Sequence, residues 1–231
     1  MSAGPRTGRF RVVRTNTERA PDTADRLDEL SWAGLADRFR RDPRLLLPVG
    51  SCIQHGPHLP LGTDSLITSR LARDVCRRTG ILLAPLLPFG VASAEDLAYA
   101  GTAGLERKTL HRVLNELVQS WERQGLKEVT LLTTNGNTRN IQALAMVMGD
   151  TVRVRSIDTR AIDVSHVLEE ASPTAHAGVY ETSLMLHVAP ELVRSDGNDG
   201  ALPAGSTAEK GQELYEYLVD SIVGRLRADD P

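Results

Sequence analysis

The order of apolar patterns along the chain is the feature that most constrains its fold. Short apolar runs typical of buried strands alternate with longer stretches in which apolar residues recur at helical spacing. The alternation predicts an α/β fold, a three-layer sandwich with a mainly parallel sheet and helices on both faces. The expected strands are "RLLLPVG" (44–50), "GILLAPLLP" (80–88), "EVTLLTT" (128–134) and "TVRVRSID" (151–158).

Helical spacing recurs between and after these strands. Ser31 is a suitable N-cap for a first helix, and further helices are expected over 64–78, 106–124, around Ile141 to Met148, over 179–187 and over 207–227. A length of 231 residues suits one compact domain, expected over 25–231. Residues 1–24 are rich in Arg, Thr, Gly and Pro, and we expect a flexible N-terminal arm there.

Composition and charge exclude several classes of protein. The net charge is −3, so no basic surplus indicates binding to nucleic acid. No apolar run has the length of a membrane span, and the N-terminus lacks the apolar segment of a secretory signal. The 2 cysteines form neither a disulfide framework nor a paired metal motif. We expect a cytoplasmic protein without a membrane partner.

Four polar segments follow or lie near the expected strand ends. They are "SCIQHGPHLPLGTD", "ASAEDLAYAGT", "NGNTRN" and "SPTAHAGVYETS". Because ligands of open parallel sheets bind beyond the carboxyl ends of the strands, a single site could gather all four.

His55 and Asp64 are the first candidate pair, since imidazole and carboxylate are common ligands of Zn, Mn and non-haem Fe. Asp64 begins a helix and could equally be an N-cap. His55 lies in a Gly/Pro loop, where a packing role is harder to explain. His58 could be a substrate contact, a ligand or a structural residue of the loop.

His176 and Glu181 are the second candidate pair. Glu181 belongs to the first turns of a helix, where a carboxylate complements the helix dipole. Leu184 and Leu186 nevertheless indicate burial, and a buried carboxylate needs a partner or a metal. His176 could be a general acid and base near neutral pH, or a loop histidine with a structural hydrogen bond.

The "NGNTRN" segment is the third piece. Asn-Gly favours a tight turn, and between a strand and a helix its N–H groups can face an anion. Arg139 would bring a positive charge to the rim of the site, or it is a solvated arginine at a helix start.

The motifs together resemble those of the creatininase (creatinine amidohydrolase) family. "PVGSCIQHGPHLPLGTD" is similar to the family pattern PxGSxEQHGPHLPLxTD, "NGNTRN" to NGHGGN, and "HAGVYETS" to HAGxxETS. The resemblance covers about residues 27–227. It implies a parallel α/β sandwich, commonly in hexamers, that hydrolyses non-peptide C–N bonds of small amides at a two-metal centre. The family also includes an enzyme that trims the mycofactocin precursor peptide.

The resemblance also implies a ligand set. One metal would be held by His55, Asp64 and Glu181, all of which are present. The second metal would be held at the positions of Ile53, Asp64 and Asn137. Ile53 and Asn137 stand there in place of the usual glutamate and histidine, and neither can replace them as a ligand. We therefore expect one divalent ion (Zn, Mn or Fe) per chain.

The same losses suggest how the rest of the site is used. We expect Arg139 to occupy the space of the lost ion and bind a substrate carboxylate or a developing oxyanion. His176 would shuttle a proton to the leaving nitrogen. Asp96 stands where a histidine is common and Tyr99 where a phenylalanine is common, and both are expected, with His58 and Asn137, to contact the substrate.

The expected function is that of a divergent metal-dependent amidohydrolase that cleaves a non-peptide C–N bond of a cyclic or small amide, as a tailoring step in a biosynthetic pathway. The alternatives are a scaffold or partner subunit that kept the fold, and a metal-free enzyme that closes or rearranges a ring. A homo-oligomer, by analogy a hexamer, is also expected.

Overall fold

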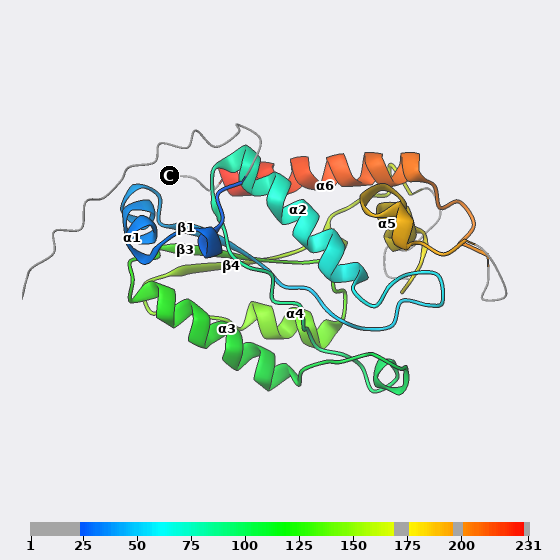
Figure 1. Cartoon of the computed structure of the whole chain (residues 1–231), viewed down its shortest axis with the longest axis horizontal. Helices are drawn as coiled ribbons and strands as arrows, with labels where there is room; N and C mark the ends of the chain where they lie inside the picture. Colours follow the sequence, from blue (N-terminus) through cyan, green and yellow to red (C-terminus); the bar gives the residue numbers. More distant parts are fainter. Residues whose placement is uncertain (1–23, 169–175, 196–200, 229–231) are drawn as a thin grey trace, which may run out of the picture.

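A four-stranded parallel sheet forms the middle layer of the molecule. The computed structural model describes residues 24–168, 176–195 and 201–228 (Figure 1). In that part of the chain the sheet has the order β2-β1-β3-β4, and every neighbouring pair is parallel. Its strands are β1 (Arg44–Pro48), β2 (Leu82–Leu83), β3 (Glu128–Thr133) and β4 (Arg153–Asp158). The expected α/β fold is confirmed.

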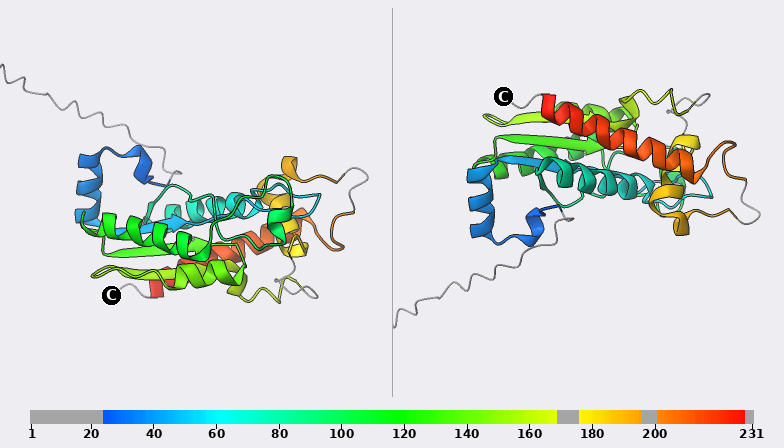
Figure 2. Two further views of the ribbon diagram at one scale, coloured as in Figure 1. Left: turned by 90° about the horizontal axis from the view of Figure 1, so that it is seen from below. Right: turned by 90° about the horizontal axis from the view of Figure 1, so that it is seen from above.

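Helices cover both faces of this sheet. Figure 1 shows α3 and α4 on one face and α2, α5 and α6 on the other, and Figure 2 gives the same arrangement from two further sides. Helix α1 lies at the opposite end of the molecule from α5. The α-helices are α1 (Trp32–Arg41), α2 (Thr63–Thr79), α3 (Arg107–Glu122), α4 (Thr138–Ala145), α5 (Val179–Val188) and α6 (Ala208–Ala228). The 3-10 turns are η1 (Leu27–Glu29), η2 (Asp96–Ala98), η3 (Thr159–Ala161) and η4 (Pro190–Leu192).

Strand β1 shows why an unbroken apolar run becomes a central strand. Leu45 and Leu47 pack into the core beneath α3 and α4, whereas Leu46 packs into the core beneath α2 and α6. Successive side chains of a strand point to opposite faces, so a strand covered on both faces needs apolar residues at every position.

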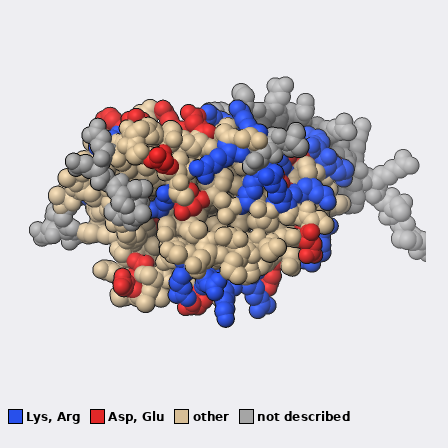
Figure 3. Space-filling model, turned by 180° about the vertical axis from the view of Figure 1, so that it is seen from behind, with Lys and Arg blue, Asp and Glu red and all other residues tan. Residues whose placement is uncertain are grey.

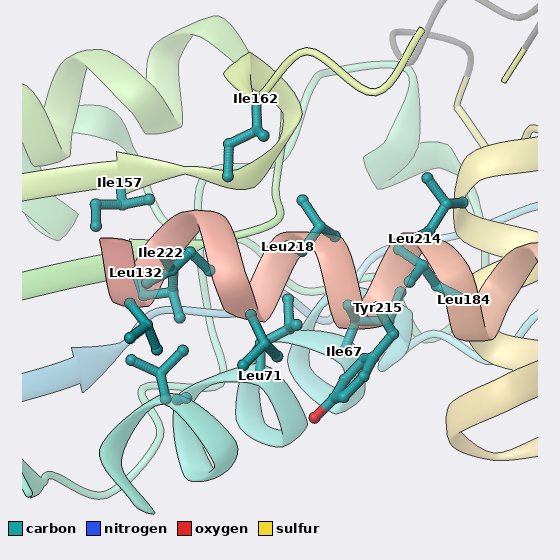
Figure 4. Close-up of a cluster of buried hydrophobic side chains, with 14 of the residues drawn as sticks. Ile67, Leu71, Leu132, Ile157, Ile162, Leu184, Leu214, Tyr215, Leu218 and Ile222 are labelled. Atoms are coloured by element: carbon teal, nitrogen blue, oxygen red, sulfur yellow. The ribbon is translucent and has the colours of Figure 1, made fainter. Parts of the chain in front are cut away.

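The larger of the two cores lies between the sheet, α2 and α6. Figure 4 shows Leu218 and Ile222 of α6 in one cluster with Leu71 of α2 and Leu132 of the sheet. Leu71 of α2 and Leu132 of β3 are fully buried in the same cluster. This packing fixes the start of α2, which carries one of the candidate ligands.

Two predicted elements end earlier than expected. The strand predicted over 80–88 contracts to β2, because Pro85 and Pro88 have no N–H to donate to the sheet. The helix predicted to continue to Met148 ends at Ala145. Met148 is 74% exposed, and Val147 fills the core in its place. The chain leaves the helix there to reach β4.

The predicted arm over 1–24 falls, apart from Ala24, outside the described residues. Among the described helices, none is both long and apolar enough to cross a bilayer. On the face shown in Figure 3, groups of Lys and Arg side chains occur together with acidic ones, so the face does not carry a single sign of charge.

Candidate active site

A cavity of about 600 Å³ opens beyond the carboxyl ends of the strands. All four polar segments picked out in the sequence contribute to its wall. The loop after β4, which the sequence analysis did not single out, contributes as well. The lining residues are Ile53, Gln54, Asp64, Ser93, Glu95, Asp96, Tyr99, Asn135, Gly136, Asn137, Asp158, Arg160, Ala161, His176 and Glu181.

The loop after β1 holds Asp64 in place. Gly50 passes so close to α2 that a Cβ there would lie 2.7 Å from the Cα of Ser65. The Ser51 hydroxyl donates to Asp64 Oδ2 at 2.6 Å, and the Ser65 hydroxyl donates to the Ser51 carbonyl at 2.7 Å. These contacts leave Asp64 Oδ1 facing the cavity side of the loop.

His55 lies against this carboxylate and is 1% exposed. Its Nδ1 is 3.0 Å from the carbonyl oxygen of Ile53, to which an Nδ1–H would donate. That contact directs Nε2 toward two carboxylates. Nε2 lies 3.4 Å from Asp64 Oδ1 and 3.8 Å from Glu181 Oε1. Both Nε2 and Asp64 Oδ1 are buried without a hydrogen-bond partner.

Glu181 comes from the first turn of α5. The Ala177 N–H donates to its Oε2 at 2.5 Å, and the guanidinium of Arg160 pairs with its Oε1. Ala177 has a φ of 53°, which is uncommon for a residue other than glycine. The turn before α5 therefore adopts an unfavourable backbone conformation while its N–H fixes the Glu181 carboxylate.

The two carboxylates control the charge of His55. Burial by itself favours neutral imidazole, but the nearby Asp64 and Glu181 outweigh it and raise the pKa of His55 to about 9. Burial also opposes the charged form of Asp64, yet His55, Ser51 and Arg160 keep the pKa of Asp64 below its usual value. Without a metal, a protonated His55 offsets part of the negative charge of the two carboxylates.

His176 lies at the mouth of the cluster. Its ring centroid is 4.5 Å from that of His55, and its Nε2 is 2.5 Å from the Gln54 carbonyl oxygen. His55, His176 and Glu181 offer ligand atoms within 4.8 Å of one another. His176 is exposed, so it can reach both the ligand cluster and solvent.

Asp96 and Tyr99 reach the cavity from the segment containing η2. Asp96 accepts bonds from the Ser93 hydroxyl at 2.6 Å and from Gln54 Nε2 at 2.9 Å. Burial raises the pKa of Asp96, but these donors outweigh it and lower the pKa below its usual value. Tyr99 is 58% exposed at the mouth.

Two further predicted residues support the architecture. His58 does not line the cavity, and its Nε2 lies 2.9 Å from the Thr182 hydroxyl, which ties the loop after β1 to α5. Asn137 lines the cavity but is the N-cap of α4. Its Oδ1 accepts the N–H of Arg139 at 2.9 Å and that of Asn140 at 3.4 Å.

The arginine in the cavity is Arg160, which the sequence analysis did not single out, and the prediction that Arg139 lies there is wrong. Arg139 does not line the cavity, and its guanidinium pairs with Glu106 at 2.9 Å on the surface. Arg160, whose side chain is 7% exposed, lies in the cavity wall beside Glu181. The missed signal was its position, because Arg160 follows the strand "TVRVRSID" as directly as the other segments follow theirs.

The residues present fit one divalent ion. Two buried ligand atoms without hydrogen bonds, on a histidine and an aspartate, face each other beside a glutamate. A histidine whose other nitrogen bonds a backbone carbonyl is the usual form of a metal ligand. At two positions expected to hold a second ion, the Ile53 side chain is apolar and the Asn137 oxygen already accepts two N–H groups.

The fold and the site together define a parallel α/β sandwich that carries a histidine and two carboxylates, a candidate metal centre, in a cavity at its strand ends. The family model for creatininase (creatinine amidohydrolase) matches residues 28–201. The chain belongs to this family of hydrolases, and the resemblance noted in the sequence is confirmed.

Relatives in two activity classes match most of the chain. The mycofactocin precursor peptide peptidase of Mycobacterium ulcerans (strain Agy99) is 31% identical, over 80% of this chain and 84% of its own. The creatinine amidohydrolase of Pseudomonas putida is 26% identical, over 88% and 96%. A solved structure of creatininase with Mn in its title has a TM-score of 0.78 at 22% identity, covering 90% of this chain and 99% of that one.

Proposed function

We propose that the chain is a metal-dependent amidohydrolase that cleaves a C–N bond with one divalent ion (Zn, Mn or Fe) per chain, held by His55, Asp64 and Glu181. The observation that carries the proposal is the pair of buried ligand atoms, His55 Nε2 and Asp64 Oδ1, that face each other without hydrogen bonds. Leaving such atoms unsatisfied costs free energy, and a cation between them would remove that cost.

The ion would supply Lewis-acid chemistry, polarising an amide carbonyl and lowering the pKa of water. The chain's own residues would orient the ligands and transfer the proton. Ser51 and the Ala177 N–H orient the two carboxylates. His176, at the boundary between the cluster and solvent, takes up a proton from the attacking water and passes it to the leaving nitrogen.

The substrate is a polar amide, and a non-peptide amide of small size is the first candidate. A cavity of about 600 Å³ is within the usual range of small-molecule sites. The second candidate is the end of a peptide, which the name of the Mycobacterium ulcerans relative supports. A cavity of this size would admit only the terminal part of such a chain.

Hydrolysis of a panel of small amides and short peptides, followed by detection of the released amine, tests the proposal. Activity should disappear with a chelator and return with Zn, Mn or Fe. His55→Ala should abolish it, because His55 lies in the ligand cluster. His187→Ala is the matched control, since His187 is exposed at the end of α5 and outside the cavity. Activity that survives both the chelator and His55→Ala would contradict the proposal.

A further inference from the structure

Arg160 is a charged side chain built into the wall of the cavity. It lies in η3, directly after β4, where its N–H donates to Asp158 Oδ1 at 2.9 Å. Its side chain is 7% exposed and pairs with Glu181. Its guanidinium carbon lies 5.5 Å from the ring centroid of the buried Tyr180. These contacts hold the guanidinium in one orientation, which is uncommon for so long a side chain.

The neighbouring loop makes room for this side chain. A Cβ at Gly136 would lie 2.7 Å from Arg160 Cδ and 2.8 Å from its Nε. The stem of Arg160 therefore crosses the loop after β3 only because residue 136 has no side chain. Gly136 and Arg160 come from two adjacent strand ends, and both line the cavity.

The charges around Arg160 decide what it can bind. The cavity wall is otherwise acidic, with Asp64, Glu95, Asp96, Asp158 and Glu181, and among the described lining residues Arg160 is the one arginine or lysine. It is therefore the side chain with which a substrate anion would pair. A guanidinium in a cavity wall pairs best with the planar oxygens of a carboxylate.

We propose that Arg160 is a substrate-binding residue that anchors a carboxylate of the substrate inside the cavity. The proposal rests on the function proposed above and narrows its substrates to amides that carry a carboxylate close to the scissile bond. Free carboxylic acids of small amides and the C-terminus of a peptide share this chemistry. Arg160 takes the anchoring role that the sequence suggested for Arg139.

The experiment compares trifluoroacetate with trifluoroacetamide, which are similar in size but differ in charge. Their binding to the zinc-loaded full chain is followed by fluorine NMR. We expect trifluoroacetate to bind the more tightly, and Arg160→Gln to weaken it about tenfold or more, as loss of a charge-assisted pair does. Arg160→Lys, which keeps the charge but not the planar fork, should fall between the two.

Two further variants keep the test decisive. Gly136→Ala leaves every charge in place but displaces the Arg160 stem, and it should also weaken trifluoroacetate binding, even if Arg160→Gln fails to fold. Arg139→Gln removes the surface arginine and should leave trifluoroacetate binding as in the wild type. Equal binding of the two probes by the wild type, or wild-type trifluoroacetate binding by Arg160→Gln, would overturn the proposal.

Measurement of zinc in the same samples separates this proposal from the one on which it rests. A wild-type chain that takes up no zinc contradicts the metal-dependent function. The probe comparison, repeated with a chelator, still decides whether Arg160 holds a carboxylate. The preference for trifluoroacetate could instead be lost when zinc is removed and be unaffected by Arg160→Gln. That result would show that trifluoroacetate binds to the zinc ion, and it would overturn the role of Arg160.

Discussion

Ile53 occupies a position where a glutamate is common, and it still serves the site. Its side chain is 3% exposed and carries no ligand atom. Its backbone carbonyl, however, accepts the bond that orients the His55 ring. A change of side chain at this position therefore removes one potential ligand without disturbing the tautomer of its neighbour.

Ser51 is predicted to control metal affinity without touching the ion. Ser51→Ala removes the hydroxyl that donates to Asp64 Oδ2. We expect metal affinity to fall about 10–100-fold, as it does when a partner that orients a ligand is lost. Ser93→Ala is the matched control, because Ser93 makes the same kind of bond to Asp96 outside the ligand set. Titration with a competing chelator measures both, and equal affinities in the two variants would contradict the prediction.

The charge of His55 predicts how the stability of the metal-free protein depends on pH. The pKa of His55 is raised from 6.5 to about 9 in the folded chain. Its protonation therefore stabilises the fold fully below about pH 6.5, and this contribution, about 3 kcal/mol at most, is lost as the pH rises toward 9. Urea unfolding with a chelator at pH 6 to 9 should show the decline, and His55→Ala should remove it. A decline of the same size in His55→Ala would contradict the assignment.

At the scale of elements, most helices and strands could be predicted from the sequence, because the spacing of apolar residues matches the positions that are buried in the structure. Helix α2 begins and ends within one residue of the segment expected over 64–78. Prolines shortened the strand expected over 80–88, and the return to β4 ended α4 before Met148. Both effects depend on neighbours that a local pattern does not contain.

The location of the candidate site could be predicted, because the carboxyl ends of parallel strands meet at one edge of the sheet. The convergence of four segments followed from that rule. The same rule does not predict which arginine enters the cavity, because both Arg139 and Arg160 follow strands. Only the three-dimensional structure shows that Glu106 holds Arg139 on the surface, whereas Gly136 admits the stem of Arg160.

The contact between α5 and α6 depends on the absence of a side chain at Gly211. A Cβ there would collide with the backbone carbonyl of Ser183 in α5. Gly211→Ala should therefore lower the free energy of unfolding by about 1–3 kcal/mol. Gly224→Ala is the control in the same helix, where a Cβ meets nothing within 4 Å, and it should raise stability by about 0.5–1 kcal/mol. Urea denaturation measures both changes, and equal effects would contradict the packing described.

At the scale of the whole molecule, the proposed ligands join distant parts of the chain. His55 lies in the loop after β1, Asp64 at the start of α2 and Glu181 at the start of α5. An ion bound only by the folded chain stabilises it by mass action. Zinc at about 100 times its dissociation constant should raise the melting temperature by roughly 5–10 °C. A thermal scan of wild type and His55→Ala, with zinc and with a chelator, measures the rise, and an equal rise in both would contradict the site.

The number of ions per chain tests the central claim most directly. Elemental analysis of the untagged protein should find about one equivalent of Zn, Mn or Fe, since the proposed ligands His55, Asp64 and Glu181 together hold one ion. The equivalent should be lost in Asp64→Ala and kept in Asp96→Ala, because Asp96 is bound by Ser93 and Gln54 away from the cluster. About two equivalents in the wild type, or none, would contradict the account.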